Sequence, residues 1–151
     1  MKRIIEVLLM FVFLMNACQQ NTEKIEKECL NNAIKEANID NNYQWVVILP
    51  GLGCHGCIQE AEFFMTEYVT EKRILFVLTK ISSLKILQQK TEVRINEHSN
   101  IFVDRNNLFD MPTNNRIYPC VVQLKSGKVY KHSFQCPENA AFYQLEQQLT
   151  K

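Results

Sequence analysis

Apolar runs and apolar stripes alternate along this chain, and their spacing predicts which segments form strands and which form helices. Unbroken runs of β-branched and aromatic residues are typical of buried strands, and a Ser-Gly pair between two such runs favours a hairpin. The predicted strands are residues 45–49, 73–78, 101–103, 117–124 and 129–134, with the hairpin turn at Ser126-Gly127. The polar stretch 104–107 predicts a turn, in which Asp104 has a structural role.

Apolar residues that recur three or four positions apart predict four helices. Thr22 can cap the first helix and Ser82 and Ser83 the third, and Pro137 suits the first turn of the last. The apolar stripes are Ile25, Cys29, Ala33, Ile34 and Ala37; Cys57, Ala61, Phe64, Met65 and Tyr68; Leu84, Ile86 and Leu87; and Ala141, Phe142, Leu145 and Leu149. With a length of 151 residues, this pattern predicts a single α/β domain.

The first residues have the character of an export signal. A basic start precedes an apolar run at residues 4–15, which is too short to span a bilayer as a permanent helix. The sequence Leu14-Met15-Asn16-Ala17-Cys18 that ends this run resembles a bacterial lipobox. In lipoproteins the chain is cut before that cysteine, and the cysteine is lipidated.

The lipobox resemblance implies a signal peptide at residues 1–17, a lipidated tether at 18–23 and a folded domain at 24–151. An acyl chain on Cys18 would hold the protein at a membrane surface. Gln19 beside it, in place of Asp, is similar to lipoproteins sent to the outer membrane. The expected location is therefore the bacterial cell envelope, with the domain facing the periplasm or the cell surface.

Charge and cysteine content restrict the partners and the compartment. The formal net charge is +1, and it falls to 0 without residues 1–17, so no basic excess points to nucleic acid. We expect no nucleic-acid partner and a monomeric protein. The chain has 6 cysteines; without Cys18 an odd number is left, so at least one thiol is unpaired within a monomer. Export would place the others where disulfides persist.

The strand at 45–49 leads through a glycine-containing turn to two cysteines that open a helix, Cys54 and Cys57. A thiol in the first turn of a helix lies beside unpaired backbone N–H groups and the positive end of the helix dipole, which favour the thiolate. Cys54, nearer the turn, is the expected attacking thiolate, and Cys57 the thiol that resolves a mixed disulfide. A protonated His55 between them would stabilise the thiolate further.

Three other interpretations of the cysteine pair stay open. The pair could form a structural disulfide, or the domain could be a redox-inert scaffold for a partner. The sequence Gly51-Leu52-Gly53-Cys54-His55-Gly56-Cys57 is also similar to the loop of heavy-metal-associated domains, and two thiolates can hold a soft ion such as Cu(I). His98 and His132 are isolated in the sequence and are expected at the surface, so no further metal ligand is predicted.

The order of elements resembles the thioredoxin fold: strand, Cys-x-x-Cys helix, strand, helix, X-Pro, hairpin and final helix. Among its members, exported TlpA-like proteins are the most similar. The resemblance implies a central mixed sheet flanked by helices, and a thiol–disulfide oxidoreductase that needs no cofactor and acts on protein cysteines. It also implies a cis bond before Pro119, and Tyr118 backbone groups that contact substrate. The supporting site residues are His55, Gly56, Tyr118, Pro119 and Cys120.

This chain departs from the thioredoxin pattern inside the motif and beneath it. His55-Gly56 replaces Gly-Pro, and Ile48 stands where thioredoxin keeps a buried Asp. The proton acceptor for Cys57 is therefore unidentified, with Glu60 as a candidate, and the direction of electron transfer is not fixed by the sequence.

The sequence does not fix the state of the remaining cysteines, Cys29, Cys120 and Cys136. Cys29 and Cys120 are interpreted as small core residues, although Cys120 could exchange with the active pair. The predicted hairpin register places Cys120 opposite Ser133 and puts Cys136 on the other face, which argues against a bond between these two cysteines unless a bulge intervenes.

Overall fold

The computed structural model describes residues 21–150, so the predicted signal peptide and Cys18 lie outside the described residues. A helix at residues 21–36, called the N-terminal helix below, comes first. The elements that follow are β1 (Trp45–Pro50), α2 (His55–Tyr68), β2 (Ile74–Thr79), α3 (Leu84–Thr91), η1 (Ile95–Glu97), β3 (Ile101–Asp104), η2 (Asn114–Ile117), β4 (Cys120–Lys125), β5 (Lys128–Phe134) and α4 (Ala141–Leu149). None of the described helices is long and apolar enough to cross a membrane.

The strands form one mixed sheet of five strands in the order β3-β2-β1-β4-β5. β1 pairs in parallel with β2, and β2 in parallel with β3, whereas β4 runs antiparallel to both β1 and β5. β1 and β2 are buried at every position, as their unbroken apolar runs predict. The α/β class and the mixed sheet are confirmed, and the arrangement is compatible with a thioredoxin-like fold.

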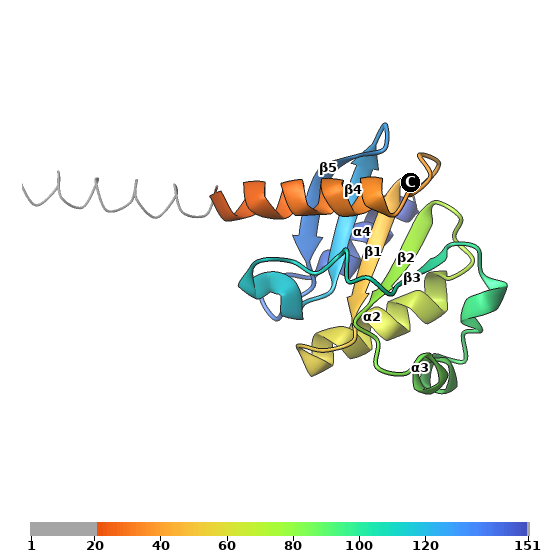
Figure 1. The fold of residues 1–151 in the computed structure, drawn as a ribbon. Coiled ribbons are helices and arrows are strands. Elements are labelled where there is room, and N and C mark those ends of the chain that lie inside the picture. Colours follow the sequence, from red (N-terminus) through yellow and green to blue (C-terminus); the bar gives the residue numbers. More distant parts are fainter. Residues whose placement is uncertain (1–20, 151) are drawn as a thin grey trace, which may run out of the picture.

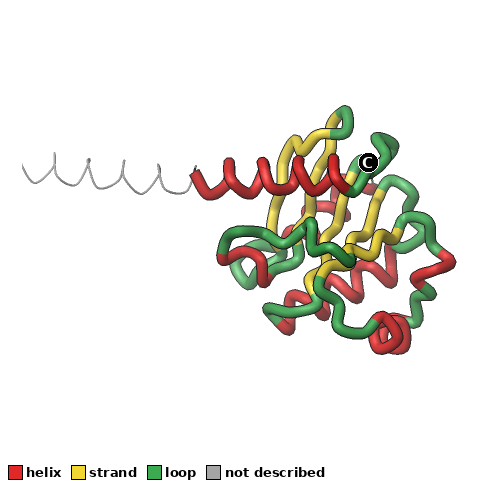
Figure 2. Tube along the Cα trace, viewed as in Figure 1, coloured by secondary structure: helices red, strands yellow, loops and turns green. Residues whose placement is uncertain are grey.

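Alternate residues of the central strands supply two separate cores, one on each face of the sheet. Trp45, Val47 and Leu49 face helices α2, α3 and α4. Val46 and Ile48 face the other way, toward the N-terminal helix and the chain around Phe109 and Met111. Figure 1 shows the N-terminal helix crossing in front of the sheet and α4 behind it, and Figure 2 shows the strands sandwiched between helical layers.

Two of the predicted helices differ from the structure in detail. The N-terminal helix buries Leu30, which is fully buried, while Ile25 is exposed, so its apolar face is rotated from the predicted stripe. The reason is that Leu30 continues the spacing of Ala33 and Ile34 toward the sheet, and Ile25 does not. Pro137 lies outside α4, in a turn closed by pairing between Cys136 and Asn139.

The predicted hairpin is present, but the predicted register is wrong for the strand residues far from the turn. Lys125 pairs with Lys128 around the Ser126-Gly127 turn, as predicted. A register shift between Gln123 and Leu124 then moves Cys120 opposite Phe134 instead of Ser133. A bulge of this kind adds one residue to one strand, and composition alone gives no sign of it.

Two predictions based on local side-chain chemistry, for Ser83 and Asp104, are confirmed. Ser83 is the N-cap of α3, and its hydroxyl accepts a hydrogen bond from the Ile86 N–H at 3.3 Å. Asp104 is buried, and its carboxylate accepts hydrogen bonds from the N–H groups of Leu108 and Phe109 at 3.0 and 2.9 Å. Asp104 therefore folds its turn, as predicted, and both of its oxygens are engaged there.

Candidate redox site at the start of helix α2

Cys54 and Cys57 are joined by a disulfide, with their Cα atoms 5.3 Å apart. Cys54 is the N-cap residue of α2 and is half-buried, whereas Cys57 lies in the first turn and is only 5% exposed. The two cysteines therefore differ in exposure, and Cys54 is the more accessible of the pair. Cys57 sits on the face of α2 that continues through Ala61 and Phe64 into the core.

The turn between β1 and α2 depends on a close approach between two backbones. Gly53 has φ = 149°, a value that L side chains rarely adopt, and a Cβ atom there would overlap the backbone of Ile117. The Cys54 N–H donates a hydrogen bond to the Ile117 carbonyl at 3.0 Å. The cysteine turn is thus docked against the end of η2, which is more than fifty residues away in the sequence.

Pro119 follows this docked segment, and the bond before it is not as predicted. No peptide bond is cis in the described residues, so Tyr118–Pro119 is trans. The trans form is the intrinsic preference of X-Pro bonds, and the chain leaves η2 in an extended conformation at Tyr118 that leads straight into β4. The Tyr118 N–H donates to the Asn115 carbonyl at 2.9 Å, so this N–H is not available to a substrate.

The residues between and after the cysteines face solvent. His55 and Gly56 are exposed, and a Cβ at Gly56 would meet nothing within 4 Å. Glu60, one turn beyond the cysteines, is also exposed, and its carboxylate accepts a hydrogen bond from Gln135 at 2.5 Å. Position 48 supplies no buried acid beneath the cysteines, because Ile48 packs in the core on the N-terminal helix side.

The other three described cysteines are free thiols: Cys29, Cys120 and Cys136. Cys120 is fully buried on the N-terminal helix side, while α2 covers the opposite face of the sheet. Burial, with a smaller contribution from the nearby Glu26 carboxylate, raises the pKa of Cys120 far above that of an ordinary thiol. Burial also raises the pKa of Cys29, whose Sγ lies 3.6 Å from the Asp110 carbonyl. Both fit the interpretation as core residues.

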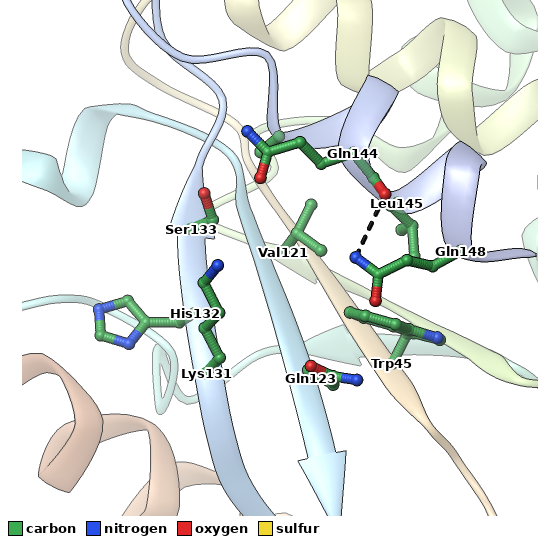
Figure 3. A pocket seen from close by; sticks show the side chains of 10 residues that line it. Trp45, Val121, Gln123, Lys131, His132, Ser133, Gln144, Leu145 and Gln148 are labelled. Atoms are coloured by element: carbon green, nitrogen blue, oxygen red, sulfur yellow. Dashed lines mark hydrogen bonds between the residues drawn. The ribbon is translucent and has the colours of Figure 1, made fainter.

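A buried polar cluster behind the cysteine turn was not predicted. Glu26 on the N-terminal helix and His132 on β5 are paired, with His132 Nε2 and Glu26 Oε2 at 3.0 Å and both side chains 4% exposed. His132, predicted at the surface, points toward the N-terminal helix: Figure 3 shows its ring turned away from the pocket that Lys131, Gln144 and other residues line. The missed signal is that Glu26 shares the helical spacing of Leu30 and Ala33.

Exposed apolar side chains flank the disulfide. Leu52, two residues before Cys54, is 68% exposed, and Ile117 is 41% exposed. Phe63, further along α2, is 68% exposed and borders a shallow groove with Tyr143 of α4. Exposed apolar side chains are thus present on both sides of the cysteine turn and further along α2.

No group of three or more His, Cys, Asp or Glu side chains in residues 21–150 is arranged to hold a metal ion. In comparisons with protein-family models, with curated proteins and with solved structures, nothing matches the chain.

Proposed function

We propose that this protein is a thiol–disulfide oxidoreductase of thioredoxin-like fold that acts on protein cysteines in the bacterial cell envelope. The observation that carries the proposal is the Cys54–Cys57 disulfide at the N-terminus of α2, in which Cys54 is half-buried and Cys57 is buried. A disulfide that only braced the fold would not need this asymmetry. Lipidation of Cys18, on the lipobox resemblance, would tether the protein to the membrane.

The chemistry proceeds by two exchanges at sulfur. A substrate thiolate attacks Cys54 Sγ; the substrate–Cys54 bond forms, and the Cys54–Cys57 bond breaks. Cys57 leaves as a thiolate and takes up a proton. A second substrate thiolate then attacks the substrate sulfur of the mixed disulfide and releases Cys54. Two electrons pass to the protein, and the substrate gains a disulfide.

The same steps run in reverse when the protein is reduced. Cys54 thiolate then attacks a substrate disulfide, and Cys57 resolves the mixed disulfide by attacking Cys54 Sγ. The N-terminal N–H groups of α2 stabilise the thiolate in either direction. The reduced form would be regenerated by an external dithiol, and the oxidised form by an external disulfide.

The decisive experiment is a redox titration of the full-length protein in detergent. The protein is equilibrated in thiol–disulfide buffers of stepped potential and alkylated, and the state of Cys54 and Cys57 is measured by peptide mass. A reversible couple between about −270 and −120 mV is expected, with exchange abolished in Cys54→Ser. A potential below about −300 mV would make the disulfide structural. A pair that stays reduced and copurifies with Cu(I) would instead indicate a metal-binding module.

A further inference from the structure

Glu26 is a carboxylate buried where the fold does not need one. It is 3% exposed, on the face of the N-terminal helix that packs against the sheet. Leu30, Ala33 and Ile34 already bury this helix. A buried carboxylate costs desolvation energy, and apolar residues of similar volume often serve packing equally well. The contacts of Glu26 therefore point to a role other than packing.

Those contacts reach a single segment beside the cysteines, together with His132. Glu26 Oε1 accepts hydrogen bonds from Thr113 Oγ1 at 2.6 Å and from Asn115 Nδ2 at 2.8 Å. Thr113 caps η2 by accepting from the Asn115 N–H, and the Asn115 carbonyl holds the Tyr118 N–H. One carboxylate thus fixes both the start and the middle of the turn at residues 113–118.

The far end of that turn touches the redox site. The Ile117 carbonyl accepts the Cys54 N–H at 3.0 Å, and Gly53 lies so close to Ile117 that a side chain would not fit between them. In Figure 1 the η2 turn and the turn that opens α2 both lie at the lower end of the sheet, where β1 ends and β4 begins. A shift of residues 113–118 would consequently change the backbone contacts of Cys54.

We propose that Glu26 is a positioning residue for the redox pair: it holds the turn at residues 113–118 against Cys54 and so limits the reactivity of the Cys54 sulfur. This rests on the proposed function. While the turn is held, the Cys54 N–H is engaged by Ile117. When the turn is released, this N–H becomes available to the Cys54 thiolate, and reagents reach the sulfur more easily. Both changes favour the thiolate and its reactions.

The test compares Glu26 variants of the full-length protein in detergent. The rate at which iodoacetamide alkylates reduced Cys54 is measured from pH 5 to 9, with the site read by peptide mass. In Glu26→Leu, which keeps volume and removes both hydrogen bonds to the turn, we expect the rate at pH 7 to rise at least threefold. The pH of half-maximal rate should fall, and the equilibrium with glutathione should shift toward the reduced dithiol by a similar factor. Glu26→Gln, which keeps an acceptor oxygen, should stay within about twofold of wild type.

A matched control breaks another bond of the same helix. Asn31 Oδ1 accepts the Val129 N–H at 3.0 Å and links the helix to the hairpin without reaching the η2 turn. Asn31→Ala should therefore leave the alkylation rate and its pH profile unchanged. Asn115→Ala, which acts from the turn side, should reproduce the effect of Glu26→Leu, and the double variant should show no further increase.

The outcomes separate the two proposals. A wild-type rate and pH profile in folded Glu26→Leu would overturn the positioning role; if that variant does not fold, a wild-type profile in Asn115→Ala does so. An equal change in Asn31→Ala would also overturn it, because the effect would then follow from helix docking in general. Failure of the oxidoreductase proposal gives a different result. The redox titration of the wild-type protein then shows no reversible couple, while the alkylation rates of the variants still report on the positioning role.

Discussion

The close contact between Gly53 and Ile117 allows a sharp test of how the cysteine turn is held. Alanine at position 53 must adopt φ = 149° and place its Cβ on the backbone of Ile117. The unfavourable backbone conformation costs about 1 to 3 kcal/mol. The Ile117 backbone must also move, and loss of the hydrogen bond from the Cys54 N–H adds roughly 0.5 to 1.5 kcal/mol. We therefore expect Gly53→Ala to lower the free energy of unfolding by about 2 to 4 kcal/mol.

Equilibrium unfolding in urea measures this loss in the oxidised protein. Trp45 is the one tryptophan in the sequence and is 7% exposed, so its fluorescence reports directly on opening of the core. With a slope of about 1.5 kcal/mol per molar urea, the midpoint should fall by roughly 1 to 3 M. The disulfide is kept intact in both proteins, so that its loop-closing effect is common to them.

Gly56, three residues further on, is the matched control. A Cβ there would meet nothing within 4 Å, and the residue lies inside α2. Because glycine is a poorer helix former than alanine, Gly56→Ala should leave stability unchanged or raise it by up to about 1 kcal/mol. The reasoning is refuted if Gly53→Ala costs less than about 0.5 kcal/mol, or if the two substitutions have the same effect.

Three further predictions concern groups away from the turn. The Thr79 hydroxyl is the one buried side-chain polar group in residues 21–150 without a hydrogen-bond partner. Thr79→Val should therefore raise the free energy of unfolding by about 1 kcal/mol, measured by urea denaturation, and a loss of stability would mean that the hydroxyl has a partner. Cys120 should resist iodoacetamide at pH 8 in the native protein, because burial raises its pKa, while half-buried Cys136 reacts. Cys120→Ser should lower the free energy of unfolding by roughly 1 to 3 kcal/mol and leave thiol–disulfide exchange at Cys54 intact. Hydrogen bonding from Arg73 lowers the pKa of Glu71 below its ordinary 4.5, so this carboxylate stabilises the fold above that pH, and the contribution is lost as pH falls through the lowered pKa. Glu71→Gln should therefore be slightly less stable than wild type at pH 7, and a difference that persists at pH 2 would contradict this assignment.

Local patterns were sufficient to predict the elements that carry the candidate site. The apolar run from Trp45 to Leu49 is a buried strand, and Cys57, Ala61 and Phe64 lie on the buried face of the helix that follows. Ser83 and Asp104 act within a few residues of their own positions. In each case the interaction is between near neighbours, so the sequence contains both partners in one window.

What could not be predicted depends on partners far away in the chain. Glu26 meets Thr113, Asn115 and His132, which are at least 87 residues downstream, and nothing near Glu26 marks it as buried except its spacing. The trans bond at Pro119 is set by the path of η2 into β4, and the register of Cys120 by a bulge in the hairpin. The spacing of residues in the sequence shows which face of a helix or strand is buried, but it does not identify the distant residues that this face contacts.

The long reach of the N-terminal helix has a consequence for the order of folding. Lys27, Cys29 and Asn31 contact Tyr130, Asp110 and Val129, so these three residues of the helix find their polar partners in the last third of the chain. During synthesis the helix is complete long before those partners exist. Contacts of such sequence separation close large loops and form late. Docking of the first helix should therefore be the closing event of folding, completed only after the final hairpin has formed.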